Sequence, residues 1–490
     1  MDGPHLGTAG CHRYHPLSSS ELPRSRLLVL VLLTVMVGML VCGGCGGRHR
    51  VPASRDDSPS ARTSPAAADW MRHSQRIAAG VPLLIRVGLA TDLSAVNVTT
   101  SGPTRLLAGD QRREVVSLQK GEHIELRPSG RGVRWQAGGQ GGEAEVCFIA
   151  PRDPDHLLTW NDTPYRGELL GLPAGGKVTL VNVLELETYL QGVVPWEIGR
   201  PGAEAKAAVE AQAVAARTYT ISHLGEREDF GFDVWASVQD QVYRGAHGED
   251  VVCNVAISAT VGLVLRSGGH EIEAYYSSTC GGRTSNVDEV WPRPARSYLI
   301  SHRDSMGDGP PFCAGATYFN WQVAWSAHEL EQILQRTLPE YVAYISSSGT
   351  RTEWAGRVFT PRSADARPEK PGRLRDLAVI SRTTSGRVGR LDVTTDAGVY
   401  HVRGDRIRWV LEPPGGDPAI LRSALCELVV TRDAGGQPLR IVVTGQGYGH
   451  GVGMCQEGSL AMARSGYSSR SILAHYYPGT RLEPFAAGAP

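Results

Sequence analysis

One carboxylic acid in this 490-residue chain stands in surroundings that suit acid catalysis. Glu197 ends the tight apolar turn GVVPWE and lies between Trp196 and Ile198. Apolar neighbours disfavour the ionised form of a carboxyl group, so we expect a raised pKa for Glu197. A carboxylic acid that stays protonated near neutral pH can protonate the leaving oxygen of a glycosidic bond. The alternative interpretation is that Glu197 caps the helix that follows it or pairs with Arg200.

The elements that must position Glu197 are predicted from the residues on each side of it. Before the turn, Val181 to Leu190 is mostly apolar, and after it Pro201 and Gly202 break the chain. An alanine-rich helix is then expected from Ala203 to about His223, because alanine is the best helix former. Glu197 should therefore lie at a junction between two ordered elements.

The turn and the helix together resemble a known family signature. LETYLQGVVPWEIG, followed by AVEAQAVAARTY, is similar to the core motif of the SpoIID/LytB family of sporulation and cell-wall proteins. In that family, the glutamate that matches Glu197 is the catalytic acid/base of a peptidoglycan lytic transglycosylase. The resemblance implies cleavage between N-acetylmuramic acid and N-acetylglucosamine, giving 1,6-anhydro ends, on strands already stripped of stem peptides. Such a reaction needs one acid/base, whereas ordinary glycosidases need a carboxyl pair; Asp240 and Asp288 remain candidate second acids.

Further segments follow the family's later motifs in the same order. They are QVYRG at 241–245, STCGGRT at 278–284 and the glycine-rich GQGYGHGVGMCQEG at 445–458. Given the resemblance, we expect substrate contacts for polar residues in these segments and at the end of the alanine-rich helix. These residues are Arg217, Tyr219, Gln241, Tyr243, Arg283, His450 and Gln456. His450 is expected to touch ligand because the glycines around it cannot shield it. For Arg217 and Tyr219, a structural hydrogen-bond pair is an equal alternative.

Two cysteines, Cys280 and Cys313, invite a disulfide or a metal site. Outside the cytoplasm a disulfide is the simpler interpretation. Some members of the resembled family hold zinc through one His and two Cys in this region. Here Ser277 stands where that His is expected, and His302 is a candidate replacement. A disulfide, one zinc ion and free thiols therefore stay open as hypotheses.

The N-terminal residues are predicted to export and tether the protein. LLVLVLLTVMVGMLVC at 27–42 is almost entirely apolar and follows two arginines. Cys45 resembles a lipidation site, and a lipoprotein, an uncleaved anchor and an ordinary signal peptide remain alternatives. We therefore expect an export signal or membrane anchor at 1–47 and a linker at 48–77. Each alternative makes the rest of the chain extracytoplasmic.

The rest of the chain predicts an α+β fold, rich in strands and with a few helices. Short apolar runs between 81 and 183 alternate with Gly, Asp and Pro, which is typical of antiparallel strands, and the pattern resumes at 373. We expect one SpoIID-like domain at 78–485, with a strand-rich part at 78–180, a core-motif part at 181–300 and a C-terminal part at 370–485 that carries the glycine-rich loop.

Composition and motifs exclude several other classes of function. The formal net charge is zero, which gives no argument for nucleic acid. The glycine-rich loop has neither the spacing of a dinucleotide fingerprint nor the Gly-Lys-Ser/Thr of a phosphate loop. Two rivals to the transglycosylase remain. One is a non-enzymatic peptidoglycan-binding protein that enhances a cell-wall amidase, and the other is a zinc hydrolase, for which the sequence has no HExxH motif. The expected partners are glycan strands, an amidase under the first rival, and the membrane through the N-terminal segment.

Overall fold

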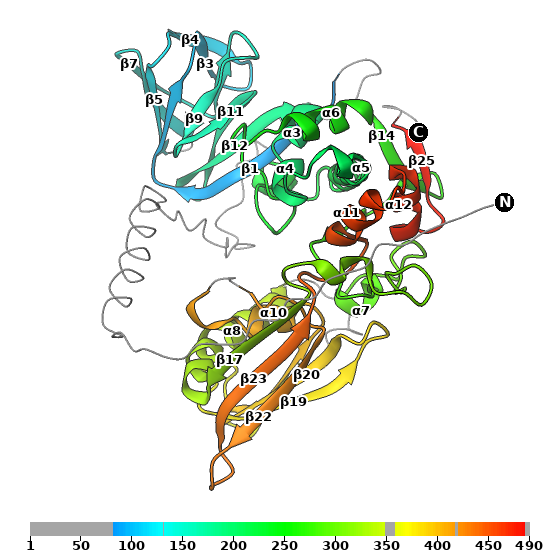
Figure 1. Cartoon of the computed structure of the whole chain (residues 1–490). Helices are drawn as coiled ribbons and strands as arrows, with labels where there is room; N and C mark the ends of the chain where they lie inside the picture. The colour runs from blue at the N-terminus through cyan, green and yellow to red at the C-terminus, as the bar shows by residue number, and fades with distance from the viewer. Residues whose placement is uncertain (1–81, 131, 348–357, 417–419, 486–490) are drawn as a thin grey trace, which may run out of the picture. The chain divides into compact units, whose positions relative to one another are not determined.

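The computed structural model describes residues 82–347 and 358–485, apart from 131 and 417–419. The expected signal or anchor at 1–47, Cys45 within it and the linker at 48–77 lie outside the described residues. Within the described part, no helix is both long enough and apolar enough to cross a membrane. The predicted α+β class, rich in strands, is confirmed (Figure 1).

Two sheets built mainly from residues 84–185 contain the strands that the sequence predicts near the start of the domain. Side chains alternate along them, as in β2, where Val96, Val98 and Thr100 are buried. One sheet has the order β13-β1-β12-β11-β8-β3-β4, with β1 and β13 parallel, and the other has the order β10-β9-β2-β5-β6-β7. In chain order the strands are β1 (Leu84–Leu93), β2 (Val96–Thr100), β3 (Thr104–Ala108), β4 (Arg113–Leu118), β5 (His123–Ser129), β6 (Gly132–Ala137), β7 (Gln140–Ala144), β8 (Cys147–Pro151), β9 (Leu158–Trp160), β10 (Thr163–Tyr165), β11 (Glu168–Ala174), β12 (Lys177–Glu185) and β13 (Val234–Trp235).

The helix at the centre of the first core is the alanine-rich segment. Ala203–Ala205 forms one 3-10 turn, and α5 (Lys206–Ser222) continues to His223, which confirms the predicted helix. Nearly every residue from Ala208 to Ile221 is buried, because α5 contacts other elements around its circumference. Those elements are the helices α6 (Val251–Ala259), α11 (Gln456–Arg464) and α12 (Ser469–Tyr476) and the strand β14 (Leu263–Ser267).

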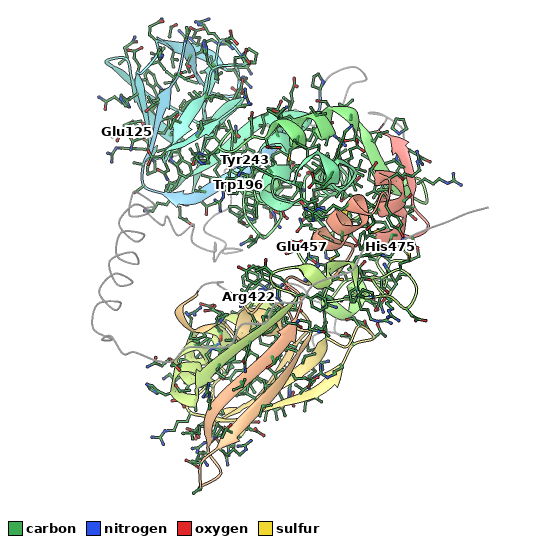
Figure 2. The ribbon with its side chains drawn as sticks, viewed as in Figure 1. Glu125, Trp196, Tyr243, Arg422, Glu457 and His475 are labelled. Carbon is green, nitrogen blue, oxygen red and sulfur yellow. The ribbon has the colours of Figure 1, made fainter. Side chains whose placement is uncertain are left out.

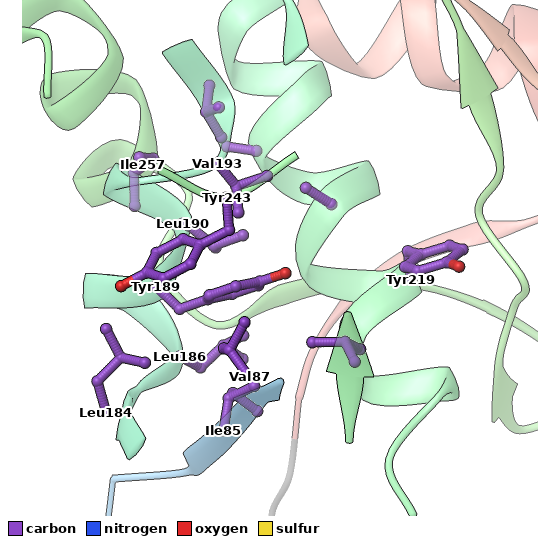
Figure 3. Packing of buried hydrophobic residues seen from close by; sticks show 14 of the residues in the cluster. Ile85, Val87, Leu184, Leu186, Tyr189, Leu190, Val193, Tyr219, Tyr243 and Ile257 are labelled. Atoms are coloured by element: carbon purple, nitrogen blue, oxygen red, sulfur yellow. The ribbon is translucent and has the colours of Figure 1, made fainter. Parts of the chain in front are cut away.

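Two short helices lead from β12 toward α5. They are α3 (Leu186–Gln191) and α4 (Val194–Glu197). Tyr189 of α3 packs against Tyr243, with ring centroids 5.1 Å apart, and Figure 3 shows both rings within the buried cluster. The apolar residues before the turn thus anchor α4 in the core.

Small sheets and turns join the glycine-rich loop to this core. β24 (Met454–Cys455) runs parallel to β16 (Tyr276–Ser277), so the two family motifs at 278–284 and 445–458 lie side by side. The remaining short elements of this part are β15 (His270–Glu271), β25 (Arg481–Pro484), α7 (Val287–Val290) and the 3-10 turns η3 (Glu228–Phe230) and η4 (Phe312–Gly315).

Residues from Trp321 to Val443 build a second apolar core. The expected C-terminal part at 370–485 is divided by this arrangement, because α11, α12 and β24 pack in the first core instead. The second core is made by α8 (Ala327–Ser347) and α10 (Arg406–Val410), with the turn η5 (Pro414–Gly416), and by the strands β17 (Asn320–Ser326), β18 (Phe359–Pro361), β19 (Leu374–Arg382), β20 (Val388–Thr395), β21 (Gly398–Arg403), β22 (Cys426–Arg432) and β23 (Pro438–Gln446). Their orders are β17-β23-β22 and β18-β21-β20-β19.

Candidate active site

Glu197 is the last residue of α4, a single helical turn with Pro195 in its first turn. Proline fits there because the first amides of a helix have no partner inside it. The turn before α4 must pass close to the chain at Gly245. A Cβ atom at Gly192 would lie 2.5 Å from the Gly245 oxygen, so this approach requires glycine. The close approach brings Glu197 against the segment that ends at Gly245.

The carboxyl group of Glu197 has two hydrogen-bond donors. The backbone N–H of Val242 donates to Oε1 at 2.6 Å, and Gln456 Nε2 lies 3.5 Å from Oε2. Burial raises the pKa of Glu197 to about 7, although both donors act in the opposite direction. Glu197 as a whole residue is nevertheless only partly buried. Glu197 is therefore a carboxylic acid that can be protonated at neutral pH.

Gln456 is the predicted binding residue that the structure brings to Glu197. It is the first residue of α11, and its amide also lies 3.4 Å from Gln212 Oε1 on α5. Only 6% of Gln456 is exposed. The Gln456 amide is thus in position to contact the Glu197 carboxyl, and its contact with Gln212 of α5 orients it.

Gln241 and Tyr243 flank Val242, but their side chains point into the core. Gln241 is fully buried: its Nε2 donates to Tyr276 at 2.8 Å, and its Oε1 accepts from Thr220 at 2.7 Å. The Tyr243 hydroxyl donates to Asn182 at 2.6 Å. The polar atoms of both residues therefore hold the backbone around Val242, and the substrate contact expected for them stays a prediction.

Arg217 and Tyr219 also support the site from inside. Arg217 is 0% exposed and makes a two-pronged ion pair with Glu187 of α3, at 2.8 and 2.7 Å. The Tyr219 hydroxyl donates to Asp240 at 3.0 Å. For this pair, the structure favours the structural alternative over a substrate contact.

Asp240, one of the two candidate second acids, is held by partners other than Glu197. Asp240 accepts from Arg227 at 2.8 Å and from the Trp235 backbone N–H at 2.8 Å. Although burial opposes it, the pairing with Arg227 keeps the pKa of Asp240 below its ordinary value. Asp288 lies in α7. Asp240 therefore acts as an ionised anchor.

His450 and Arg283 are two further predicted binding residues, and other surroundings are seen for them. His450 packs against Trp291, with ring centroids 4.7 Å apart, and its Nδ1 accepts from the Val452 backbone N–H. Burial lowers the pKa of His450 to about 4, so the ring is neutral at physiological pH. Arg283 is exposed, and among the described residues neither side chain hydrogen-bonds to the Glu197 carboxyl. Neighbouring aromatic rings partly cover His450 in spite of the glycines around it. The sequence did not reveal this coverage.

Trp196 is a candidate binding residue that the sequence analysis treated only as an apolar neighbour. Trp196, labelled in Figure 2, is 38% exposed and directly precedes Glu197 in α4. The indole N–H donates to the His247 oxygen at 2.8 Å, and the Arg200 guanidinium lies 5.4 Å from the ring centre. A ring that is exposed but held at its edge offers a fixed apolar face to a sugar. The sequence pattern does not show that Trp196 is exposed. This exposure is what marks it as a candidate binding residue.

The expected disulfide between Cys280 and Cys313 is not formed. Their sulfur atoms lie 3.7 Å apart, whereas a disulfide bond is about 2.05 Å long. Each thiol instead belongs to a buried group of four ligand-type side chains completed by Asp304 and Cys455. His302, the candidate replacement ligand, bonds to Thr284, and Asp304 takes the place expected for it.

Comparisons with known proteins match the segment that contains Glu197. A family model described as stage II sporulation protein (SpoIID) matches residues 174–266, which include Glu197, and a domain of unknown function (DUF8618) matches 346–453. An amidase enhancer of Bacillus subtilis is 30% identical over 313 residues, covering 60% of this chain and 40% of the enhancer. This chain thus spans about two fifths of that relative's length.

Two further relatives are matched over more of their own length. Stage II sporulation protein D of Bacillus subtilis is 27% identical over 319 residues, covering 62% of this chain and 75% of the relative. An uncharacterized protein of Brachyspira hyodysenteriae is 27% identical over 400 residues, covering 81% of this chain and 92% of the relative.

Proposed function

Because the chain belongs to the SpoIID/LytB family, we propose that it is a peptidoglycan lytic transglycosylase with Glu197 as its general acid and base. The observation that carries the proposal is the raised pKa of Glu197, about 7, in a residue that is only partly buried. Its substrate is the bond between N-acetylmuramic acid and N-acetylglucosamine, in glycan strands without stem peptides. The protein would meet this substrate outside the cytoplasm.

In the first step, Glu197 transfers its proton to the glycosidic oxygen as the bond from that oxygen to C1 of N-acetylmuramic acid breaks. Positive charge then develops at C1 and the ring oxygen. Glu197 is left ionised, a form that the Val242 N–H at 2.6 Å and the Gln456 amide at 3.5 Å both stabilise. These donors act on the state that exists only after proton transfer, which is where stabilisation accelerates a reaction.

In the second step, the ionised Glu197 takes the proton from the 6-hydroxyl of the same sugar. The freed oxygen forms a bond to C1 and closes the 1,6-anhydro ring, so no water is consumed and Glu197 regains its proton. One carboxyl group serves both steps. The engagement of Asp240 with Arg227 supports this choice, because a retaining glycosidase would need a second free carboxylate near the first.

The test is digestion of purified peptide-free glycan strands, with products identified by mass spectrometry. The wild-type chain should give anhydro ends, and Glu197→Gln should lower the rate by at least about 100-fold, because general acid catalysis contributes about two to four orders of magnitude. Glycan binding should persist, since the amide has the same shape. Glu185→Gln, the same change at an exposed position in the preceding segment, is the matched control and should retain full activity.

Two results would contradict this mechanism. Reducing ends in place of anhydro ends would indicate a hydrolase. Wild-type rates in a folded Glu197→Gln protein would remove Glu197 from the chemistry.

The printed name of one relative supports a second candidate, a protein that binds glycan and enhances a cell-wall amidase. This candidate predicts no glycan cleavage by any variant. It also predicts that Glu197→Gln stimulates a purified amidase as well as wild type does. Measuring amidase stimulation and anhydro products on the same protein samples separates the two functions.

A further inference from the structure

Three thiols and one carboxylate converge at a single buried point outside the acid site. Cys280, Asp304, Cys313 and Cys455 are each buried, and one ligand atom from each lies within 4.8 Å of all the others. The Cys280 and Cys313 sulfurs are 3.7 Å apart. Two thiolates on one tetrahedral zinc ion, with bonds of about 2.3 Å, would lie about 3.8 Å apart. The spacing of these sulfurs is therefore that of zinc ligands.

The surroundings of the sulfurs suit thiolates. The backbone N–H groups of Cys280 and Gly458 donate to Cys455 Sγ at 3.2 and 3.3 Å, and that of Gly282 donates to Cys280 Sγ at 3.3 Å. Such bonds favour the charged form of sulfur, which is the form that binds metal. Packing alone would not require three backbone amide groups to point at two buried sulfur atoms.

The carboxylate is oriented by residues behind it. His475 Nε2 and the Tyr476 hydroxyl both contact Asp304 Oδ1, at 3.1 and 2.9 Å, and Oδ2 is left to contact Cys280 Sγ. Cys280 Sγ donates to that oxygen at 3.0 Å. Outer groups that fix a ligand's orientation in this way are typical of metal sites.

We propose that Cys280, Asp304, Cys313 and Cys455 bind one zinc ion, through three sulfurs and one carboxylate oxygen. This ligand set differs from the one His and two Cys expected from the resemblance, because Asp304 and Cys455 come from other segments. On binding, zinc replaces the thiol protons, which go to solvent, and the thiol–carboxylate contact becomes two metal–ligand bonds. No electron transfer is involved.

Four protein ligands complete the tetrahedral shell of zinc, so the site is structural and leaves no position for a reactive water. It joins the loop after β16, the segment that carries Asp304 and Cys313, and the start of α11. Cys455 directly precedes Gln456, whose amide contacts Glu197. The zinc ion would thereby hold the end of the helix that supplies Gln456 to the acid.

The first experiment measures metal in the full chain, purified without added zinc and dialysed against a weak chelator. About one equivalent of zinc is expected per wild-type chain, since structural sites bind tightly. Cys455→Ser and Asp304→Asn should lose most of it. Cys253→Ser and Cys426→Ser, which change buried free cysteines outside the group, are matched controls and should keep it.

A second experiment does not depend on variants, because a ligand substitution can prevent folding. Wild-type protein is stripped with a strong chelator, and Zn²⁺ or Co²⁺ is added back. Saturation at one equivalent is expected, with the intense sulfur-to-cobalt absorption of a tetrahedral thiolate site. Stripping should also lower the unfolding temperature of wild type.

The proposal is overturned if wild type contains no zinc and rebinds none, or if mass spectrometry finds a disulfide among Cys280, Cys313 and Cys455 in protein purified without reductant. Retention of zinc by both ligand variants would also overturn it. Glu197→Gln should keep its full zinc content. Failure of the glycan-cleavage proposal therefore leaves this test unaffected, and the reverse also holds.

Discussion

The backbone N–H of Val242 donates a 2.6 Å hydrogen bond to Glu197 Oε1, and this bond opposes the burial that raises the pKa of the same carboxyl group. Burial prevails, and the pKa reaches about 7. The acid is therefore maintained at a cost in stability, since the folded protein must hold an ionisable group where its charged form is disfavoured.

That cost predicts a pH-dependent effect of Glu197→Gln on stability. The folded protein keeps the Glu197 proton up to about pH 7, whereas an unfolded glutamate loses it near about pH 4.3. Between these values the folded state binds the extra proton, so wild-type stability from this group falls as pH rises. Glu197→Gln should therefore unfold at a higher temperature than wild type at pH 8, and the difference should shrink toward pH 4.5. Calorimetry across this range, with Glu185→Gln as the control, checks it; a difference that is constant with pH would contradict the assignment.

The rate of glycan cleavage should report the same ionisation. Only protonated Glu197 can act as the acid, so kcat/KM should fall as pH rises through about 7. Gln456→Leu removes a hydrogen bond that favours the ionised form, so the fall should move to higher pH. Gln446→Leu, at an exposed position on β23, is the control and should leave the profile unchanged. A merely structural role of Gln456 would lower the rate without moving the profile.

The acid was predictable from sequence because its motif is local. Glu197, Pro195 and the alanine-rich helix occupy one continuous stretch, and their environment follows from near neighbours. The pKa direction expected from Trp196 and Ile198 agrees with the structure. The strands between 84 and 185 were likewise predictable from turn residues and short apolar runs.

What the sequence could not give depends on contacts between distant segments. Cys455 lies 175 residues from Cys280, and only the pairing of β24 with β16 brings their sulfurs together. Residue type alone also cannot distinguish a polar side chain that faces substrate from one that satisfies buried groups, as Arg217 and Gln241 illustrate. In α8, Pro339 stands inside the helix and argues locally against one, so residue type alone is a poor guide there.

Trp196 should contribute to binding rather than to chemistry. It is exposed, directly precedes the acid in α4, and is held by the bond to the His247 oxygen. Trp196→Ala should raise KM severalfold with a smaller change in kcat, because a stacking contact stabilises substrate and transition state alike. Trp196→Phe keeps an aromatic face and should recover part of the loss. Steady-state kinetics on peptide-free glycan measure both values. A fall in kcat at unchanged KM would place the effect on Glu197 instead.

The chain segment from Asp233 to Val242 begins with one residue of a buried ion pair. Breaking this pair should cause the largest loss of folding stability among these variants. Arg86 Nε and Nη2 donate to the two carboxylate oxygens of Asp233 at 3.0 and 2.5 Å, and both side chains are almost fully buried. Asp233→Ala leaves the arginine charge buried without its partner, which costs about 3–5 kcal/mol. Urea unfolding measures this loss.

The exposed pair of Arg127 and Glu125 provides the matched control for that measurement. Glu125→Ala should cost far less than Asp233→Ala, because water and salt screen an exposed pair. The double variant Arg86→Met with Asp233→Ala removes both charges, so it should be more stable than Asp233→Ala alone. If Asp233→Ala cost no more than Glu125→Ala, the ion pair would not be what holds this segment against β1. The position of Val242, and with it the acid's hydrogen bond, would then have to depend on the Asp240–Arg227 contact instead.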